Sequence, residues 1–436
     1  MAPGHAAALL FAFALVPACK RSPVATTNPA PSASVPATPS VSAAPTPSSS
    51  APPAASASAG PPVGAGVATW APLEETKECA TKVRELEPNL AFGGIAIAAH
   101  GKDLAVAWHY VSGKKGEGLI AFSGYDAFGR TLAVAHGIGK GTHFPAQIFP
   151  RGASWLVTWF DAQSLMFAKT SWAPNLPSAE RLNAITADEA GETAILATKG
   201  GLVGVAALGP GKREQLGLFL FAPEEEGGDP VKAIGSTRHA SVPEHPAAAE
   251  IEGAWLVAWD DELAAGAPRS VVVSRLDAAG KESEQETIST PGRTATRPSI
   301  AALDGGALIA WVEQDGVESA VVVRRLDAKG RVASPPFRVG QGAMPSLTAT
   351  KDGALLSMLR AATDGGAPQV AAVRVAATGT PAPSGRLVSD LGKGKGAVSQ
   401  PAGVAYVAEE DRLGFVFTYS DGMRGQLKTA KVEGCF

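Results

Sequence analysis

The acidic side chains of this 436-residue sequence are its most obvious candidates for catalysis. Glu244, Glu250 and Asp304 stand alone within apolar segments, whereas general acid–base cleavage of a glycosidic bond needs two carboxylates that face one substrate. The acidic runs at 224–226 and 260–262 follow apolar segments, and we interpret both as solvated turns. The sequence therefore predicts no catalytic residue.

The histidine and glycine patterns match none of the common cofactor sites. The four histidines between residues 100 and 143 lack the short paired spacing of a zinc site. The run Gly-Lys-Gly-Lys-Gly at 392–396 lacks the spacing and the strand-then-helix setting of a phosphate-binding loop. The net charge of -3 gives no basic patch for nucleic acid. We predict no metal, no cofactor and no nucleic-acid partner.

Apolar segments recur along the chain at intervals of about fifty residues. The four clearest end in Trp108, Trp159, Trp259 and Trp311, which are 51, 100 and 52 residues apart. The segment 202–206 fills the longer gap, and 354–358 and 413–417 continue the series, which makes seven units. We interpret the tryptophans as side chains that pack one unit on the next.

Each unit has the same internal order. In most units a proline about thirteen residues before the aligned position opens the first apolar segment, where a missing N–H is tolerated. Three units carry an Asp-Ala-Xaa-Gly turn, in which Asp126, Asp277 or Asp327 can cap the turn while glycine supplies a positive φ. Four short strands in each of seven units predict an all-β fold, a single seven-bladed β-propeller.

The repeats resemble the degenerate propeller repeats of exported Gram-negative bacterial proteins over roughly residues 90–436. This resemblance implies an architecture and no particular activity. A six-bladed ring that absorbs the segment 202–206 as an insertion, or a pair of β-sandwiches, are the alternatives.

The residues beside the prolines are the predicted ligand-binding positions. If the prolines open the innermost strands, their neighbours line the mouth of a central channel, where propeller ligands usually bind. These residues are His143, Phe144, His245, Arg297, Met344 and Gln400. The alternative is that they only plug the channel.

The first nineteen residues have the pattern of an export signal, with an apolar stretch from Ala6 to Val16 that is too short to span a bilayer. Their end, Leu-Val-Pro-Ala-Cys, resembles the lipobox of bacterial lipoproteins, which implies lipidation of Cys19 and, with Lys20 following, an outer-membrane location. An ordinary secretory signal, with a periplasmic or secreted product, and a retained anchor are the alternatives. Residues 20–69 are rich in Ala, Pro and Ser and predict a disordered linker before a propeller domain at 70–436.

The two ends of the propeller domain are expected to meet in one sheet. The last unit has room for three strands, near 401–408, 413–420 and 424–433, and the segment 70–83 can supply a fourth outer strand. With Cys19 assigned to the lipid, Cys79 and Cys435 remain, and we predict that they form a disulfide in an oxidising compartment.

Because no paired carboxylates and no cluster of arginines were evident, the sequence predicts a non-enzymatic function. The expected protein is a monomeric, envelope-tethered binding or scaffolding module for a protein or glycan partner. The alternative is an extracellular polysaccharide hydrolase or lyase on a propeller scaffold.

Overall fold

The computed structural model divides the chain into two units, Met1–Pro61 and Pro62–Phe436, and the residues that it describes all lie in the second. They are residues 68–69, 81–90, 92–100, 103–112, 117–126, 130–140, 147–151, 154–161, 164–170, 180–186, 190–198, 201–208, 215–221, 231–238, 243–264, 266–277, 281–283, 285–316, 318–360, 369–381, 386–388, 397–407, 412–420 and 425–432. Side chains are described for part of these residues, most completely from 243 to 360. Strands are the main regular elements of the described residues, and no helix among them could cross a membrane. The all-β prediction is confirmed.

Five sheets consist of four consecutive antiparallel strands each. The first three contain β3 (Phe92–His100), β4 (Asp103–Ser112), β5 (Glu117–Asp126) and β6 (Thr131–Lys140); β7 (Gln147–Arg151), β8 (Ser154–Asp161), β9 (Ser164–Thr170) and β10 (Glu180–Thr186); and β11 (Ala190–Thr198), β12 (Gly201–Leu208), β13 (Gln215–Phe221) and β14 (Val231–Arg238). The other two contain β15 (Glu244–Ile251), β16 (Ala254–Asp261), β17 (Ser270–Leu276) and β18 (Glu286–Thr287); and β23 (Ala343–Thr350), β24 (Gly353–Arg360), β25 (Gln369–Ala376) and β26 (Arg386–Val388).

The remaining two sheets each take a strand from the beginning of the described chain. One contains β19 (Thr294–Leu303), β20 (Gly306–Asp315), β21 (Glu318–Asp327) and β22 (Phe337–Gln341), with β1 (Ala68–Thr69) parallel to β22. The other contains β27 (Ala397–Val407), β28 (Arg412–Ser420) and β29 (Gly425–Val432), with β2 (Thr81–Leu90) antiparallel to β29.

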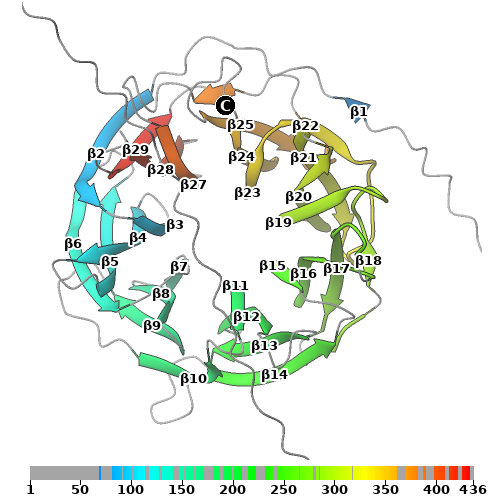
Figure 1. Cartoon of the computed structure of the whole chain (residues 1–436), viewed down its shortest axis with the longest axis horizontal. Coiled ribbons are helices and arrows are strands. Elements are labelled where there is room, and N and C mark those ends of the chain that lie inside the picture. The colour runs from blue at the N-terminus through cyan, green and yellow to red at the C-terminus, as the bar shows by residue number, and fades with distance from the viewer. Residues whose placement is uncertain are drawn as a thin grey trace, which may run out of the picture. The chain divides into compact units, whose positions relative to one another are not determined.

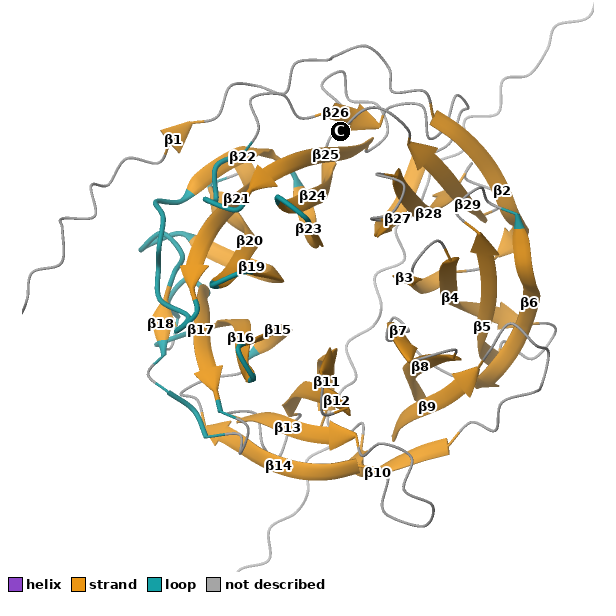
Figure 2. Cartoon of the chain, turned by 180° about the vertical axis from the view of Figure 1, so that it is seen from behind, coloured by secondary structure: helices purple, strands orange, loops and turns teal. Residues whose placement is uncertain are grey.

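The sheets follow one another around a common centre, as Figures 1 and 2 show for the second unit. The first strand of each repeat lies innermost, and these strands are β3, β7, β11, β15, β19, β23 and β27. The weak repeat at 202–206 lies in β12, within a complete four-stranded sheet. The added outer strand is β2, which starts near the end of the predicted segment 70–83 and extends to Leu90.

Two of the aligned tryptophans, Trp159 and Trp311, pack one sheet on the next, as expected. Trp311 is fully buried and contacts an apolar cluster that includes Leu256 and Val273 of the preceding sheet. Trp159 packs in the same way against Ile120 and Phe122. Removing an aromatic side chain of this size from water contributes about 4–6 kcal/mol at the usual area coefficient. These contacts hold neighbouring sheets, and therefore their inner strands, in fixed relative positions.

The Asp-Ala-Xaa-Gly turns have the predicted caps. Oδ1 of Asp126 accepts a hydrogen bond from the Arg130 backbone N–H at 2.8 Å, and Oδ1 of Asp277 accepts one from Lys281 at 2.9 Å. Oδ1 of Asp327 accepts two, from Lys329 and Arg331, each at 2.9 Å. In the last turn Gly330 has a φ of 83°, the left-handed conformation predicted for the glycine.

The cap at Asp327 predicts a pH-dependent contribution to stability. Burial alone would raise the pKa of Asp327, but hydrogen bonds from the backbone of Arg331 and Lys329 and from the Arg331 guanidinium hold the pKa below its ordinary value. A carboxyl with a lower pKa in the folded state stabilises the fold above its unfolded pKa, and this stabilisation is lost as the pH falls through the folded pKa.

We therefore expect Asp327→Asn to lower the free energy of unfolding by less than about 1 kcal/mol at neutral pH, because the ion pair is partly exposed. The difference from the parent chain should stay constant from about pH 7 to about pH 5 and shrink as the pH falls below about 4 toward about 2. Urea unfolding across this range measures it, with Asp352→Asn on an exposed turn as the control. A difference that stays constant with pH would contradict the expectation.

Candidate functional site

A bulge near the start of β15 re-aims the side chains at this end of the sheet. Glu244 pairs with Asp260 and Ala247 pairs with Ala258, so β15 holds one residue more than β16 over this stretch. The strands β3, β11, β19, β23 and β27 have the same irregularity at the corresponding place. In one common form of this bulge the first extra residue adopts a left-handed conformation and is usually glycine.

Three neighbouring sheets have a side chain where that glycine is expected. The φ angle is 47° at His245 in β15, 55° at Arg297 in β19 and 52° at Met344 in β23. In β3 and β11 the corresponding residues are Gly93 and Gly191. A left-handed φ costs a residue with a Cβ about 1–2 kcal/mol. Such strain tends to be kept at functional sites, so these three side chains are the first candidates.

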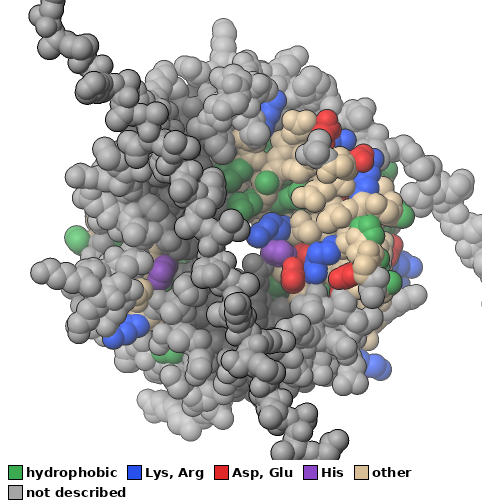
Figure 3. Space-filling model, viewed as in Figure 1, with side chains coloured by type: hydrophobic (Ala, Val, Ile, Leu, Met, Phe, Trp, Pro, Cys, Tyr) green, Lys and Arg blue, Asp and Glu red, His purple; other side chains and the backbone are tan. Residues whose placement is uncertain are grey.

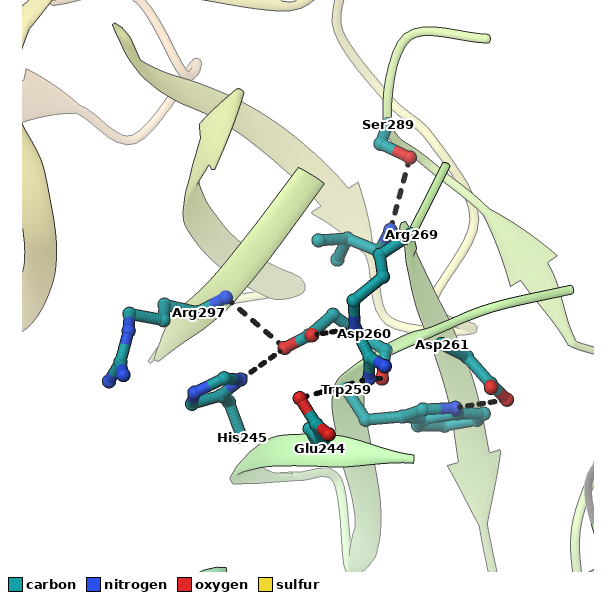
Figure 4. A network of polar contacts seen from close by, with 9 residues as sticks. Glu244, His245, Trp259, Asp260, Asp261, Arg269, Ser289 and Arg297 are labelled. Carbon is teal, nitrogen blue, oxygen red and sulfur yellow. Dashed lines mark hydrogen bonds and ion pairs between the residues drawn. The ribbon is translucent and has the colours of Figure 1, made fainter. Parts of the chain in front are cut away.

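Asp260 lies at the centre of a polar network between β15, β16 and β19 (Figure 4). Its side chain is fully buried, and its Oδ1 accepts hydrogen bonds from His245 Nδ1 at 2.7 Å and from the backbone N–H of Arg297 at 3.2 Å. Since a carboxylate can only accept, Nδ1 carries a proton, and Nε2 is the ring nitrogen that can exchange a proton with a ligand. Asp260 therefore fixes both the tautomer and the orientation of His245.

Arg269 compensates the buried charge of Asp260. Its Nε donates to Asp260 Oδ2 at 2.6 Å, and its Nη2 donates to the Asp260 backbone carbonyl at 2.6 Å. The same Nη2 lies 3.5 Å from Glu244 Oε2. On the backbone, the Arg269 carbonyl accepts a hydrogen bond from Ala295 at 2.8 Å. Arg269 therefore holds the Asp260 carboxylate from its own sheet, and the backbone N–H of Arg297 holds it from the next sheet.

Glu244, His245 and Asp260 could supply metal ligands, because one ligand atom of each lies within 4.8 Å of the others. The positive charge of Arg269 already lies against both carboxylates. Both Asp260 oxygens also accept hydrogen bonds from protein nitrogens. A cation at this place would be repelled by Arg269. We therefore describe the group as an ion-pair network that positions a histidine.

The Arg297 side chain turns away from the network that its backbone joins. It is exposed, and Figure 4 shows its guanidinium pointing away from Asp260, on the side where the His245 ring lies. In Figure 3 histidine, basic and acidic side chains gather beside the central hollow of this face. An exposed guanidinium can bind a carboxylate or sulfate through paired hydrogen bonds. The site thus combines an oriented base with an anchor for an anion.

The predicted rim residues have different outcomes. His245, Arg297 and Met344 occupy one equivalent bulge position on three successive sheets. In the register of β27, Gln400 corresponds to Glu244 instead, because Pro401 itself takes the first bulge position. His143 and Phe144 lie outside the described residues. Whether any of these residues binds a ligand remains a prediction.

Sequence reasoning missed the two residues that organise the site. The interpretation of 260–262 as a solvated turn is wrong for Asp260 and Asp261, which are buried at the end of β16. Asp261 instead accepts a hydrogen bond from the Trp259 indole at 3.4 Å. One signal was present in the sequence. Asp260 follows the aligned Trp259, whereas the residue at the same position in the next unit is Val312, so an acid there is unusual. Arg269 gave no comparable signal.

The other two isolated acids lie at the opposite end of the inner strands. Glu250 and Asp304 line a cavity of about 630 Å³ with Glu252, Lys351 and the turns that follow β15, β19 and β23. Glu250 is six residues from Glu244 along β15, which is roughly 20 Å in an extended strand. These acids therefore cannot join the Asp260 network, whereas Glu244 does.

Comparisons with known proteins support the fold class. The chain resembles an oligogalacturonate lyase from Vibrio parahaemolyticus with a TM-score of 0.52 and 12% identity, over 82% of this chain and 96% of that one. It also resembles an ulvan lyase bound to -[GlcA(1-4)Rha3S]-, with a TM-score of 0.53 and 11% identity, over 79% of this chain and 94% of that one. The chain therefore has a propeller-type β fold. No protein family model matches the sequence, and no curated protein matches it.

These comparisons contradict the prediction of a non-enzymatic binding or scaffolding module. Two solved structures that resemble this chain over about four-fifths of its length are polysaccharide lyases. Part of the reason for the prediction was also wrong, since two arginines, Arg269 before β17 and Arg297 in β19, lie at the group formed by β15 and β16. These residues are far apart along the chain, so the sequence pattern did not reveal that they lie together.

Proposed function

We propose that this protein is a polysaccharide lyase that cleaves acidic glycans by β-elimination, with His245 as the base. The observation that carries the proposal is the buried Asp260, which holds the imidazole of His245 next to the exposed Arg297. The similarity of the fold to two polysaccharide lyases supports the same reaction class.

The proposed reaction begins with the carboxylate of a uronate bound to Arg297, which stabilises the charge that develops next to the carbon losing its proton. Nε2 of His245 takes that C5 proton. The electron pair forms a C4=C5 double bond as the glycosidic C4–O bond breaks, and the leaving oxygen takes a proton from water. Asp260 stabilises the imidazolium that forms, while Arg269 keeps Asp260 in place.

Glycoside hydrolysis is less well supported by this geometry. A hydrolase needs an acid and a second carboxylate at the scissile bond. Asp260 is buried and both of its oxygens accept hydrogen bonds from Arg or His nitrogens or from backbone N–H. Of the two carboxylates in this cluster only Glu244 is exposed, and one accessible carboxylate does not complete the pair.

The reaction class can be tested by incubating the full chain with polygalacturonate, ulvan and the neutral polysaccharide xylan. A lyase produces unsaturated ends that absorb ultraviolet light, and a hydrolase produces reducing ends without that absorbance. We expect unsaturated ends from an acidic polymer and none from xylan. Reducing ends alone, or no cleavage of any acidic polymer, would refute the proposal.

Arg297→Gln is expected to raise KM for an acidic polymer by about 10- to 100-fold, because a charge-assisted pair with the substrate carboxylate is lost. The backbone N–H that donates to Asp260 is retained in this variant. Steady-state kinetics measure the effect, with Arg331→Gln on an exposed outer turn as the matched control. Equal KM values for the two variants would remove Arg297 from the site.

We also propose that the seven sheets of the described residues close into one seven-bladed propeller at 70–436. The pairing of β2 with β29 supports this arrangement. Cys79 and Cys435 lie outside the described residues, and their disulfide remains part of the proposal. So do lipidation of Cys19, a linker from residue 20 to the start of β1, a monomeric state and a location in the cell envelope, where a glycan would be within reach.

A further inference from the structure

The bulge positions of three successive sheets are connected to one another. The Arg297 backbone donates to Asp260, which ties the bulge of β19 to the sheet that carries His245. On the other side of β19, Ser299 Oγ accepts a hydrogen bond from the Leu347 backbone N–H at 2.9 Å, which ties β19 to β23 just beyond Met344. Met344 is therefore the next bulge residue in the same row as His245 and Arg297.

The fold does not require a side chain at this position. Gly93 and Gly191 occupy it in two other sheets, and glycine tolerates the left-handed φ that Met344 adopts at 52°. His245 and Arg297 have the same unfavourable conformation, and both have a place in the proposed reaction. The parallel points to a contact with substrate as the reason for Met344.

The chemistry of Met344 differs from that of its neighbour in the row. Arg297 offers a cation for one carboxylate, whereas Met344 offers a half-buried, polarizable thioether that packs against apolar groups. A carboxylate packed against the thioether would lose its water without gaining a hydrogen-bond donor or a charge from Met344.

From this row we infer that the substrate alternates an acidic sugar with a less polar one, such as a deoxy sugar, and that Met344 contacts the C–H face or methyl group of the less polar unit. This inference rests on the proposed lyase function and adds the specificity of the adjacent subsite. A homopolymer of uronate would place a carboxylate against Met344 and should be a poorer substrate.

The test compares polygalacturonate with desulfated ulvan, in which glucuronate alternates with the uncharged deoxy sugar rhamnose, in the full chain and in Met344→Arg and Met344→Gly. We expect the full chain to have at least about a tenfold higher kcat/KM on desulfated ulvan. Met344→Arg should shift the ratio of the two kcat/KM values toward polygalacturonate by about tenfold or more. Met344→Gly, which relieves the left-handed φ, should remain folded and lower kcat/KM on desulfated ulvan several-fold.

Two outcomes separate this inference from the proposed function. If the full chain cleaves an acidic polymer but Met344→Arg and Met344→Gly leave the ratio within twofold, the role of Met344 is refuted and the lyase function stands. If the full chain cleaves neither polymer, the dissociation constants of both polymers for the full chain and the two variants still measure which polymer each protein prefers. Equal binding ratios in all three would refute the inference independently of catalysis.

Discussion

Replacing His245 with glutamine is expected to lower kcat on an acidic polysaccharide by about 10²- to 10⁴-fold, the usual contribution of a positioned general base. Glutamine can still donate a hydrogen bond to Asp260, but its amide cannot accept a proton from the substrate at neutral pH. KM should change little, because the cation that anchors the substrate carboxylate belongs to Arg297. Initial rates of formation of unsaturated ends, measured at saturating substrate, give the effect.

A matched control for this variant is His136→Gln. His136 lies on β6, and its Nδ1 lies 3.0 Å from the backbone carbonyl of Val134, far from the Asp260 network in sequence. We expect this variant to keep kcat within about threefold of the parent chain, the range of a surface change. If His245→Gln retained most of the activity while its thermal unfolding matched the parent chain, His245 would not be the base.

The repeat architecture was predictable because its signals are local. Apolar segments with an aligned tryptophan, a proline at the first strand and an aspartate cap such as Asp327 each act within one unit of about fifty residues. The outer strand of the last sheet was predicted less well. β2 carries several charged residues and Pro88, so it lacks the apolar alternation that marks a half-buried strand.

The candidate site was predicted only in part because its residues meet through long-range register. Asp260 and Arg297 are 37 residues apart, and their contact depends on bulges in β15 and β19 that no local pattern announces. The prolines did identify His245 and Arg297 as residues of one row. They could not show that Asp260 turns inward, because a run of acids at the end of a strand resembles a solvated turn.

The largest expected effect on stability comes from breaking the ion pair between Asp260 and Arg269. The Asp260 side chain is fully buried and the Arg269 side chain is 21% exposed, with 2.6 Å between Nε and Oδ2. Removing one partner of a buried pair leaves the other charge without compensation, which costs about 3–5 kcal/mol. We therefore expect Asp260→Val to lower the free energy of unfolding by this amount, and Arg269→Ser to have a comparable effect.

The next sheet along the chain suggests how to restore the loss. Val312 and Ser319 occupy the positions of Asp260 and Arg269 in the β19–β22 sheet, which packs without this ion pair. The double variant Asp260→Val, Arg269→Ser copies that pair of residues. Its loss of unfolding free energy should be about 2–3 kcal/mol smaller than the sum of the losses in the two single variants, the coupling expected for residues in direct contact.

Urea unfolding of the parent chain, the two single variants and the double variant measures this coupling. The exposed pair Asp327 and Arg331, with 3.1 Å between Oδ2 and Nη2, provides a control cycle in which the coupling should stay below about 1 kcal/mol. Additive losses at Asp260 and Arg269 would mean that the network does not act as a unit. A strong coupling together with loss of turnover in the double variant would instead show that the ion pair is kept for positioning His245, since the fold itself can be built without it.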